Sequence, residues 1–268
     1  MMGRIKNGVV QIDGRTMDYI AFGHGEQTLL MIPGLSDGLK TVKGMALPFA
    51  WLYRKLAKHM RIYCFSRANS LAPGFTNRDM ARDVKLAMDI LEIKKAFVLG
   101  VSQGGMIAQW LAIDCPEAVD KLILAVTAPR QNDIIGDCIC AWTELANAHD
   151  YKGLVIQTSE RAYSESYLKK FRLSYPFLGL MPKPKSYDRY HVMAQACLTH
   201  DAYDLLDRIH SPTLIIGGEQ DEIVGAQASR DLAAQIPNCR LIMYPQYGHG
   251  AFEEAKDFQD VVLDFLNE

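Results

Sequence analysis

The uncharged run at residues 96–113, AFVLGVSQGGMIAQWLAI, most constrains how this chain can fold. Its length alone would suit a membrane-spanning helix. Three glycines, two glutamines and Ser102 inside the run argue against a span. A short buried strand, a tight turn and a buried helix explain the run better, because glycines let the strand and the helix approach each other closely. The run therefore predicts a strand, a turn with Ser102 at its tip, and a helix.

Short apolar stretches alternate with helical patterns on both sides of this run. Helices are expected at 104–113 and 226–235, and apolar residues also recur at helical spacing after Thr76 and from Phe258 onward. Strands are expected at 9–12, 16–22, 29–32, 62–65, 96–99, 122–126, 213–216 and 240–244. Such alternation is typical of an α/β fold. We predict a mostly parallel, eight-stranded sheet with helices on both faces.

The alternation stops between residues 128 and 208. This stretch has no comparable strand pattern and carries helical segments rich in Trp, Tyr, Phe and Met. Because it interrupts the sequence order of the sheet, we expect it to lie on top as a helical lid, or cap domain. Residues 1–127 and 209–268 are expected to form the core.

Composition narrows the possible partners and the compartment. The 268 residues are 49% hydrophobic and 22% charged, with a formal net charge of -2 and no basic block, which argues against nucleic acid as a partner. The first residues lack the apolar stretch of a secretory signal. The six cysteines are therefore expected to be reduced thiols in a cytoplasmic protein, and their spacing predicts no metal site. Monomer and dimer both stay open.

The turn at Ser102 has the spacing of a catalytic nucleophile. Gly100-x-Ser102-x-Gly104 between a strand and a helix exposes the serine hydroxyl, and the helix N-terminus behind it favours a developing oxyanion. A serine hydroxyl is a poor nucleophile, so the hypothesis also needs a base and an acid that orients the base.

His249 is the predicted base, and Asp221 is the predicted acid. His249 follows the strand at 240–244 between two glycines, whereas His24, His59, His149, His191, His200 and His210 suit surface or packing roles. Asp221 lies just beyond the strand at 213–216, where catalytic groups gather in α/β sheets. Its neighbours Glu219 and Glu222 remain alternatives. The order Ser102, Asp221, His249 is that of the α/β-hydrolase arrangement.

With these residues in place, the sequence resembles the α/β-hydrolase fold superfamily, and specifically its small lidded members with esterase, lactonase, C–C hydrolase and haloperoxidase-like activities. The matching segments include LLMIPG, FTNRDMARDV, LGVSQGGMIAQWLA, LILAVTAP, TLIIGGEQDEIV and YPQYGHGAF, which together span most of 16–268. The resemblance implies an oxyanion hole made by the backbone N–H groups of Gln103 and Leu35. Pro33 departs from the family's usual histidine. The loop at 66–74 keeps Arg67 and Ser70 but lacks both of the family's usual glycines.

These features predict a serine hydrolase that forms an acyl-enzyme without a cofactor. The lid aromatics Trp142, Tyr163, Tyr167 and Phe171 are expected to line an apolar pocket over the nucleophile. No cluster of lysines or arginines suggests a phosphate or multi-carboxylate substrate, so we expect a small to medium, largely apolar ester, thioester or lactone. C–C bond hydrolysis, acyl transfer, cofactor-independent oxygenation and a ligand-receptor role remain alternatives.

Overall fold

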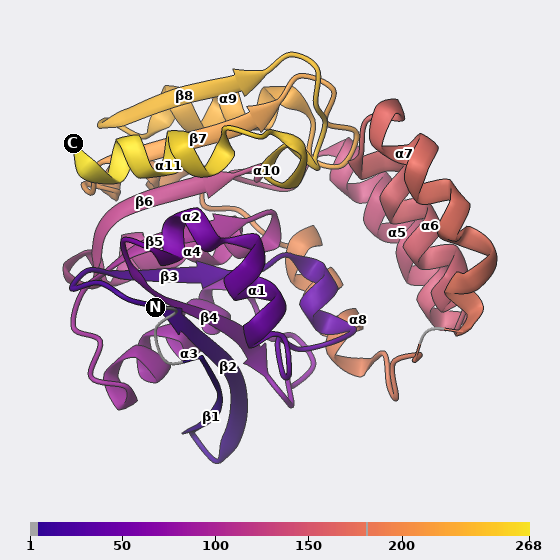
Figure 1. Cartoon of the computed structure of the whole chain (residues 1–268), viewed down its shortest axis with the longest axis horizontal. Helices are drawn as coiled ribbons and strands as arrows, with labels where there is room; N and C mark the ends of the chain where they lie inside the picture. Colours follow the sequence, from indigo (N-terminus) through magenta and orange to yellow (C-terminus); the bar gives the residue numbers. More distant parts are fainter. Residues whose placement is uncertain (1–4, 181) are drawn as a thin grey trace.

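The computed structural model describes residues 5–180 and 182–268, and within them the strands form one eight-stranded sheet (Figure 1). Its strand order is β1-β2-β4-β3-β5-β6-β7-β8. The pairs β1·β2 and β2·β4 are antiparallel and the other five are parallel. The strands are β1 Lys6–Ile12, β2 Arg15–Gly23, β3 Thr28–Ile32, β4 Arg61–Ala68, β5 Ala96–Val101, β6 Val119–Ala125, β7 Thr213–Gly218 and β8 Cys239–Tyr244. The predicted sheet is therefore confirmed.

Helices cover both faces of the sheet because successive strand residues point to opposite sides. Leu30 and Val98 belong to one buried cluster with residues of α3, α4 and α9, while their neighbours Leu29 and Phe97 belong to a second cluster with residues of α1, α2 and α11. The helices of the core are α1 Ala46–Leu52, α2 Arg54–Ala57, α3 Asn77–Ile90, α4 Gln103–Asp114, α9 Ala226–Gln235, α10 Ala251–Glu254 and α11 Phe258–Asn267.

Local chemistry sets the element ends that the sequence indicated. Asp13 and Gly14 both have positive φ, at 44° and 74°, as a type I′ hairpin turn between β1 and β2 requires. Thr76 caps α3 because its hydroxyl accepts from the Asp79 N–H at 3.1 Å, while the Asp79 carboxylate accepts from the Thr76 N–H at 3.0 Å.

Between β6 and β7 the chain forms helices and no strand in its described residues. These are α5 Asp133–Asn147, α6 Tyr151–Ala162, α7 Glu165–Phe171 and α8 Asp188–Leu198, with 3-10 helices η3 Arg172–Leu180 and η4 Tyr203–Arg208. We call residues 128–208 the insert. Figure 1 shows α5, α6 and α7 side by side beyond the sheet, with α8 closer to the core.

Buried polar contacts hold α8 on the core. The Gln103 side-chain amide donates to the Met193 carbonyl at 2.8 Å, and the Asn77 amide donates to the Ala196 carbonyl at 3.0 Å. A buried hydrogen bond is costly to break without a replacement. These contacts therefore fix one side of the insert against α3 and α4.

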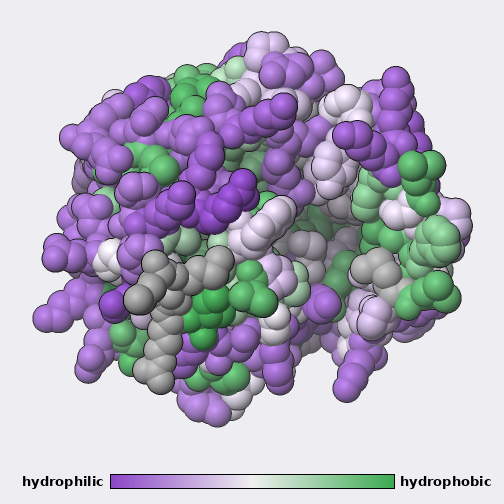
Figure 2. All heavy atoms as spheres, in the orientation of Figure 1, coloured by the Kyte–Doolittle hydropathy of each residue, from purple (hydrophilic) through white to green (hydrophobic). Residues whose placement is uncertain are grey.

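The uncharged run at 96–113 is divided between β5 and α4, as predicted. Across the described residues, no helix combines the length and apolar character that crossing a membrane requires. Figure 2 shows that the molecular face drawn is hollowed where the insert meets the core, with hydrophobic residues along the insert side.

Candidate active site

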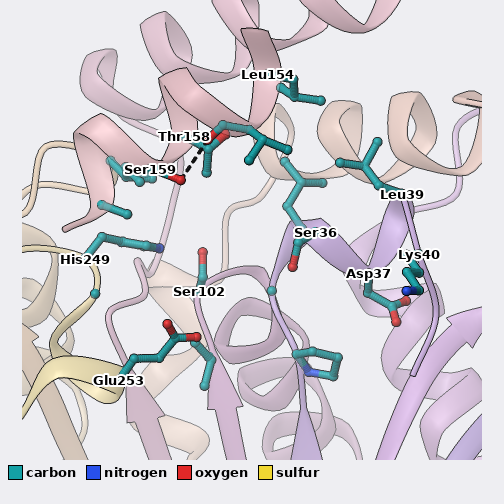
Figure 3. A pocket seen from close by; sticks show the side chains of 18 of the residues that line it. Ser36, Asp37, Leu39, Lys40, Ser102, Leu154, Thr158, Ser159, His249 and Glu253 are labelled. Carbon is teal, nitrogen blue, oxygen red and sulfur yellow. Dashed lines mark hydrogen bonds between the residues drawn. The ribbon is translucent and has the colours of Figure 1, made fainter. Parts of the chain in front are cut away.

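Ser102 sits at a sharp turn between β5 and α4, with φ 54° and ψ −122°. A Cβ on Gly104 would lie 1.9 Å from the Ile32 carbonyl oxygen, and one on Gly100 would lie 2.5 Å from the Gly104 carbonyl oxygen. Both positions therefore require glycine. The Thr127 hydroxyl donates to the Ser102 carbonyl at 2.7 Å and supports the turn from the chain beyond β6. This geometry directs the Ser102 hydroxyl into a cavity (Figure 3).

His249 and Asp221 form a buried pair. His249 Nδ1 lies 2.8 Å from Asp221 Oδ2, and Asp221 Oδ1 accepts from the N–H groups of Ile223 and Val224 at 2.8 and 2.9 Å. Burial alone would raise the pKa of the Asp221 carboxyl. The nearby His249 and these hydrogen bonds outweigh burial and lower that pKa. Asp221 is therefore an ionised partner that can orient the imidazole.

The alternative acids do not contact His249. Glu219 forms an ion pair with Arg230 at 2.6 Å near the surface, and the Glu222 backbone carbonyl accepts from the Cys138 thiol. Asp221 is thus the one of the three acidic candidates that is hydrogen-bonded to His249.

A cavity of about 450 Å³ brings Ser102 and His249 together under the insert. In Figure 3 His249 reaches it from the chain before α10, while Leu154, Thr158 and Ser159 of α6 face it from above. Within the described residues Ser102 and His249 form no hydrogen bond. Hydrogen bonds between catalytic groups are often long before a substrate is bound, so the two side chains remain a candidate nucleophile and base.

Two of the four predicted pocket aromatics line this cavity and two do not. Trp142 and Tyr163 are lining residues. Tyr167 and Phe171 are not part of the lining, and their rings pack against that of Tyr163. The rings of Tyr163 and Tyr167 stack with centroids 4.3 Å apart, and the Phe171 ring lies 6.0 Å from that of Tyr167. The aromatic residues of α7 therefore support the cavity wall from outside.

Two backbone N–H groups beside Ser102 are free to bind an anion. Leu35 opens the 3-10 helix η1 Leu35–Gly38 and Gln103 opens α4. Neither N–H has an acceptor in the described part of the chain. A Cβ on Gly34 would lie 3.3 Å from the Ser102 Cβ, which shows how closely the Leu35 loop approaches the serine. Unpaired donors at helix starts suit an oxyanion.

Arg67 supports this loop through two hydrogen bonds. Its guanidinium donates to the Pro33 carbonyl, and its backbone N–H donates to Asp37 Oδ2 at 2.9 Å. Arg189 of α8 donates to the same Asp37 oxygen at 2.7 Å. The loop is thereby connected to β4 and to the insert. The roles of Asp37 and Arg189 were missed because no local pattern pairs residues so far apart.

The cavity also has a carboxyl group that the sequence analysis missed. This group belongs to Glu253, which lies on α10 four residues after His249. The Tyr163 hydroxyl donates to Glu253 Oε2 at 2.5 Å. Its place four residues after the predicted base was the available signal. The six cysteines are free thiols, and the described residues contain no group of side chains arranged to bind a metal ion.

Comparisons with known proteins show the family to which the chain belongs. The family model described as alpha/beta hydrolase fold matches residues 27–256. The chain is 31% identical over 193 residues to 2-hydroxymuconate semialdehyde hydrolase of Pseudomonas putida, covering 68% of this chain and 66% of that protein.

Two solved structures, each 20% identical to the chain, share its fold. The MGS-M2 α/β hydrolase from a Medee basin deep-sea metagenome library has a TM-score of 0.84, with 97% of this chain and 98% of that one covered. The enol-lactonase of Burkholderia xenovorans LB400 has a TM-score of 0.81, with 97% and 100% covered. Because the family model matches most of the chain, the chain belongs to the α/β-hydrolase fold family and is an α/β-fold hydrolase.

Proposed function

We propose that the protein is a serine hydrolase that cleaves a small to medium carboxylic ester, thioester or lactone through an acyl-enzyme. One observation carries this proposal. Ser102 projects from a strained turn into the same cavity as His249, whose far ring nitrogen is held by the buried Asp221. This arrangement supplies a nucleophile, a base and an orienting acid.

Each group then has a role in the reaction. The Ser102 hydroxyl attacks the substrate carbonyl while His249 Nε2 accepts the serine proton, and Asp221 stabilises the resulting imidazolium. The N–H groups of Leu35 and Gln103 bind the oxyanion of the tetrahedral intermediate. His249 returns the proton to the leaving group, and a water molecule activated by the same base releases the acid from Ser102.

We assign the insert the role of a cap domain over the core. Its support is the cavity lining, to which α5, α6 and the chain that joins α6 to α7 contribute many side chains. These are Trp142, Tyr151, Leu154, Val155, Thr158, Ser159, Ala162 and Tyr163. A largely apolar roof excludes water from the acyl-enzyme and limits the acyl groups that fit.

Hydrolysis of a carbon–carbon bond is a second candidate for the same residues. Its support is the 31% identity to 2-hydroxymuconate semialdehyde hydrolase. Purified protein would be offered 2-hydroxymuconate semialdehyde and a p-nitrophenyl ester side by side. Turnover of the semialdehyde with a far higher kcat/KM than the ester would favour the second candidate.

Ser102→Ala tests the first candidate, because a fluorophosphonate probe labels only an activated serine. We expect the variant to lose probe labelling and about 10⁴–10⁶-fold of ester turnover while it stays folded. Ser159→Ala is the matched control. Ser159 lines the same cavity, but its hydroxyl donates to the Val155 carbonyl at 2.8 Å. Labelling that survives in Ser102→Ala and disappears in Ser159→Ala would refute the assignment.

A further inference from the structure

A second cavity of about 690 Å³ adjoins the one that holds Ser102, and lysines dominate its charged lining. Lys40 and Lys43 come from the chain between η1 and α1, while Lys183 and Lys185 come from the chain that leads into α8. We call this cavity, with these four residues, the lysine groove. Folding brings together two pairs that are separated by about half of the sequence, which is why no basic cluster is visible in the sequence.

The four ammonium groups have no carboxylate partner among the described residues. All four side chains are exposed. Arg189 also lines the groove, but its guanidinium is already bonded to Asp37 at 2.7 Å and to the Ala68 carbonyl at 3.0 Å. Asp188 is the one carboxylate in the described lining. The groove thus holds four lysines and one carboxylate, an excess of positive charge.

The groove adjoins the cavity over Ser102 and shares part of its lining. Leu39, Lys40, Thr41 and Tyr151 line both spaces. A substrate whose carbonyl lies against Ser102 can therefore extend past these residues and present its far end to the lysines. Charged groups that line a cleft raise the local concentration of ligands of opposite charge.

The two ends of this combined space differ in charge. In Figure 3 His249 and Glu253 lie on one side of Ser102, and Lys40 lies on the other. The carboxyl group of Glu253 offers no attraction to an anion. An anionic group on a substrate is therefore favoured at the end that leads to the lysine groove.

We propose that the lysine groove binds an anionic oxygen group, a carboxylate or a phosphate, on the substrate at a distance from the bond that Ser102 cleaves. The proposal rests on the hydrolase function proposed above and specifies its substrate class. It departs from the sequence-based expectation that no cluster of lysines or arginines suggests a phosphate or multi-carboxylate substrate.

Matched substrate pairs test the proposal and separate the two sources of charge. The first pair is the p-nitrophenyl monoester of adipic acid and its methyl ester, which differ by one carboxylate in the acyl chain. The second pair is a coenzyme A thioester and the dephospho-coenzyme A thioester of the same acid, which differ by one phosphate in the leaving group. We expect the anionic member of at least one pair to have the higher kcat/KM. The pair that shows the preference identifies whether the groove binds a carboxylate on the acyl chain or a phosphate on the leaving group.

The double variant Lys183→Gln/Lys185→Gln should reduce that preference by about threefold to tenfold, because each exposed ion pair contributes modestly. In about 0.5 M salt the preference of the parent should shrink in the same direction, since salt screens exposed charges. Lys58→Gln/Lys94→Gln is the matched control, with two exposed lysines outside both cavities. The control should keep the preference of the parent. No preference in either pair, or a preference that the groove variant keeps, would overturn the proposal.

A binding measurement separates this inference from the proposed function. Calorimetric titration of Ser102→Ala with the adipate monoester and with its methyl ester needs no turnover. Tighter binding of the monoester, lost when Lys183→Gln/Lys185→Gln is added, supports the groove even if the hydrolase assignment fails. Ester turnover that depends on Ser102, combined with equal binding of the two esters, would retain the hydrolase and refute the groove.

Discussion

At the scale of single residues, the site depends on which buried polar groups have partners. Asp221 is buried but has His249 and two backbone N–H groups to keep it ionised. His200 is buried in a different environment. It is 3% exposed, and its ring packs edge-on against Trp110 with centroids 6.4 Å apart. Burial disfavours the charged imidazolium and lowers the pKa of His200 to about 4.

His200 should therefore make the fold sensitive to acid. Its pKa in the unfolded chain is near 6.5, so below that pH the unfolded state binds a proton that the folded state does not. Stability from this residue is present above pH 6.5 and declines as the pH falls toward 4. We expect His200→Phe to remove about 2 kcal/mol of the stability difference between pH 7 and pH 4.5.

Urea unfolding of parent and variant at both pH values measures this effect. Phe keeps a flat ring against Trp110 and has no proton to gain. His59→Gln is the control, since His59 is exposed and should leave the pH dependence of the parent in place. Equal pH dependence in parent and His200→Phe would show that another group causes the loss of stability in acid.

At the scale of elements, the turn between β5 and α4 shows what the sequence could predict. Glycines at the right spacing predicted the turn and the place of Ser102, and the structure adds why those glycines are needed. The aromatic character of the insert led to the prediction that Tyr167 and Phe171 line the pocket. Tyr167 is instead 37% exposed, and neither residue is part of the cavity lining. Residue type alone does not say which face of a short helix meets a cavity.

Gly104→Ala should be strongly destabilising. Its Cβ would lie 1.9 Å from the Ile32 carbonyl oxygen and 2.7 Å from that of Pro33, so the backbone of the loop that carries Leu35 would have to move. We expect a loss of more than about 2 kcal/mol in the free energy of unfolding. A fall in ester turnover should accompany it, because the Leu35 N–H shifts away from Ser102.

Gly136→Ala in α5 is the matched comparison. There the nearest atom to a new Cβ is Gln131 Nε2 at 3.2 Å, the end of a flexible side chain. Alanine should be neutral or stabilise the helix by up to about 1 kcal/mol. Denaturant unfolding of both variants measures the change in the free energy of unfolding that each substitution causes. Similar stability of the two would contradict the tight packing of β5, α4 and the Leu35 loop.

At the scale of the whole molecule, the site depends on polar contacts between residues far apart in the sequence, which local patterns could not reveal. The loop that carries Leu35 is supported through Asp37 by Arg67 from β4 and by Arg189 from α8. The lysine groove likewise joins a core loop to the insert. Hydrophobic periodicity predicts elements and their order, but it carries no information about which distant polar residues meet. Side-chain hydrogen bonds thus join the insert to the core both at α8 and at α10.

The cavity roof allows one test of whether the insert selects the acyl group. Trp142 lines the cavity from α5, and its Nε1 has no hydrogen-bond partner among the described residues. Trp142→Phe removes that unpaired polar group and enlarges the space over Ser102, so the variant should stay folded. Phe171→Leu changes an aromatic residue of the same insert that lies behind Tyr163 and does not line the cavity.

We expect Trp142→Phe to raise kcat/KM for longer p-nitrophenyl esters relative to the acetate, by about tenfold for each added methylene that fits. Phe171→Leu should keep the chain-length profile of the parent, because the atoms it removes do not touch the acyl group. A series of esters from acetate to decanoate, measured on the three proteins, gives the comparison. If Trp142→Phe kept the parent's profile, the acyl group would have to bind outside the space under α5, and the selecting contacts would have to come from the core loop at Leu35.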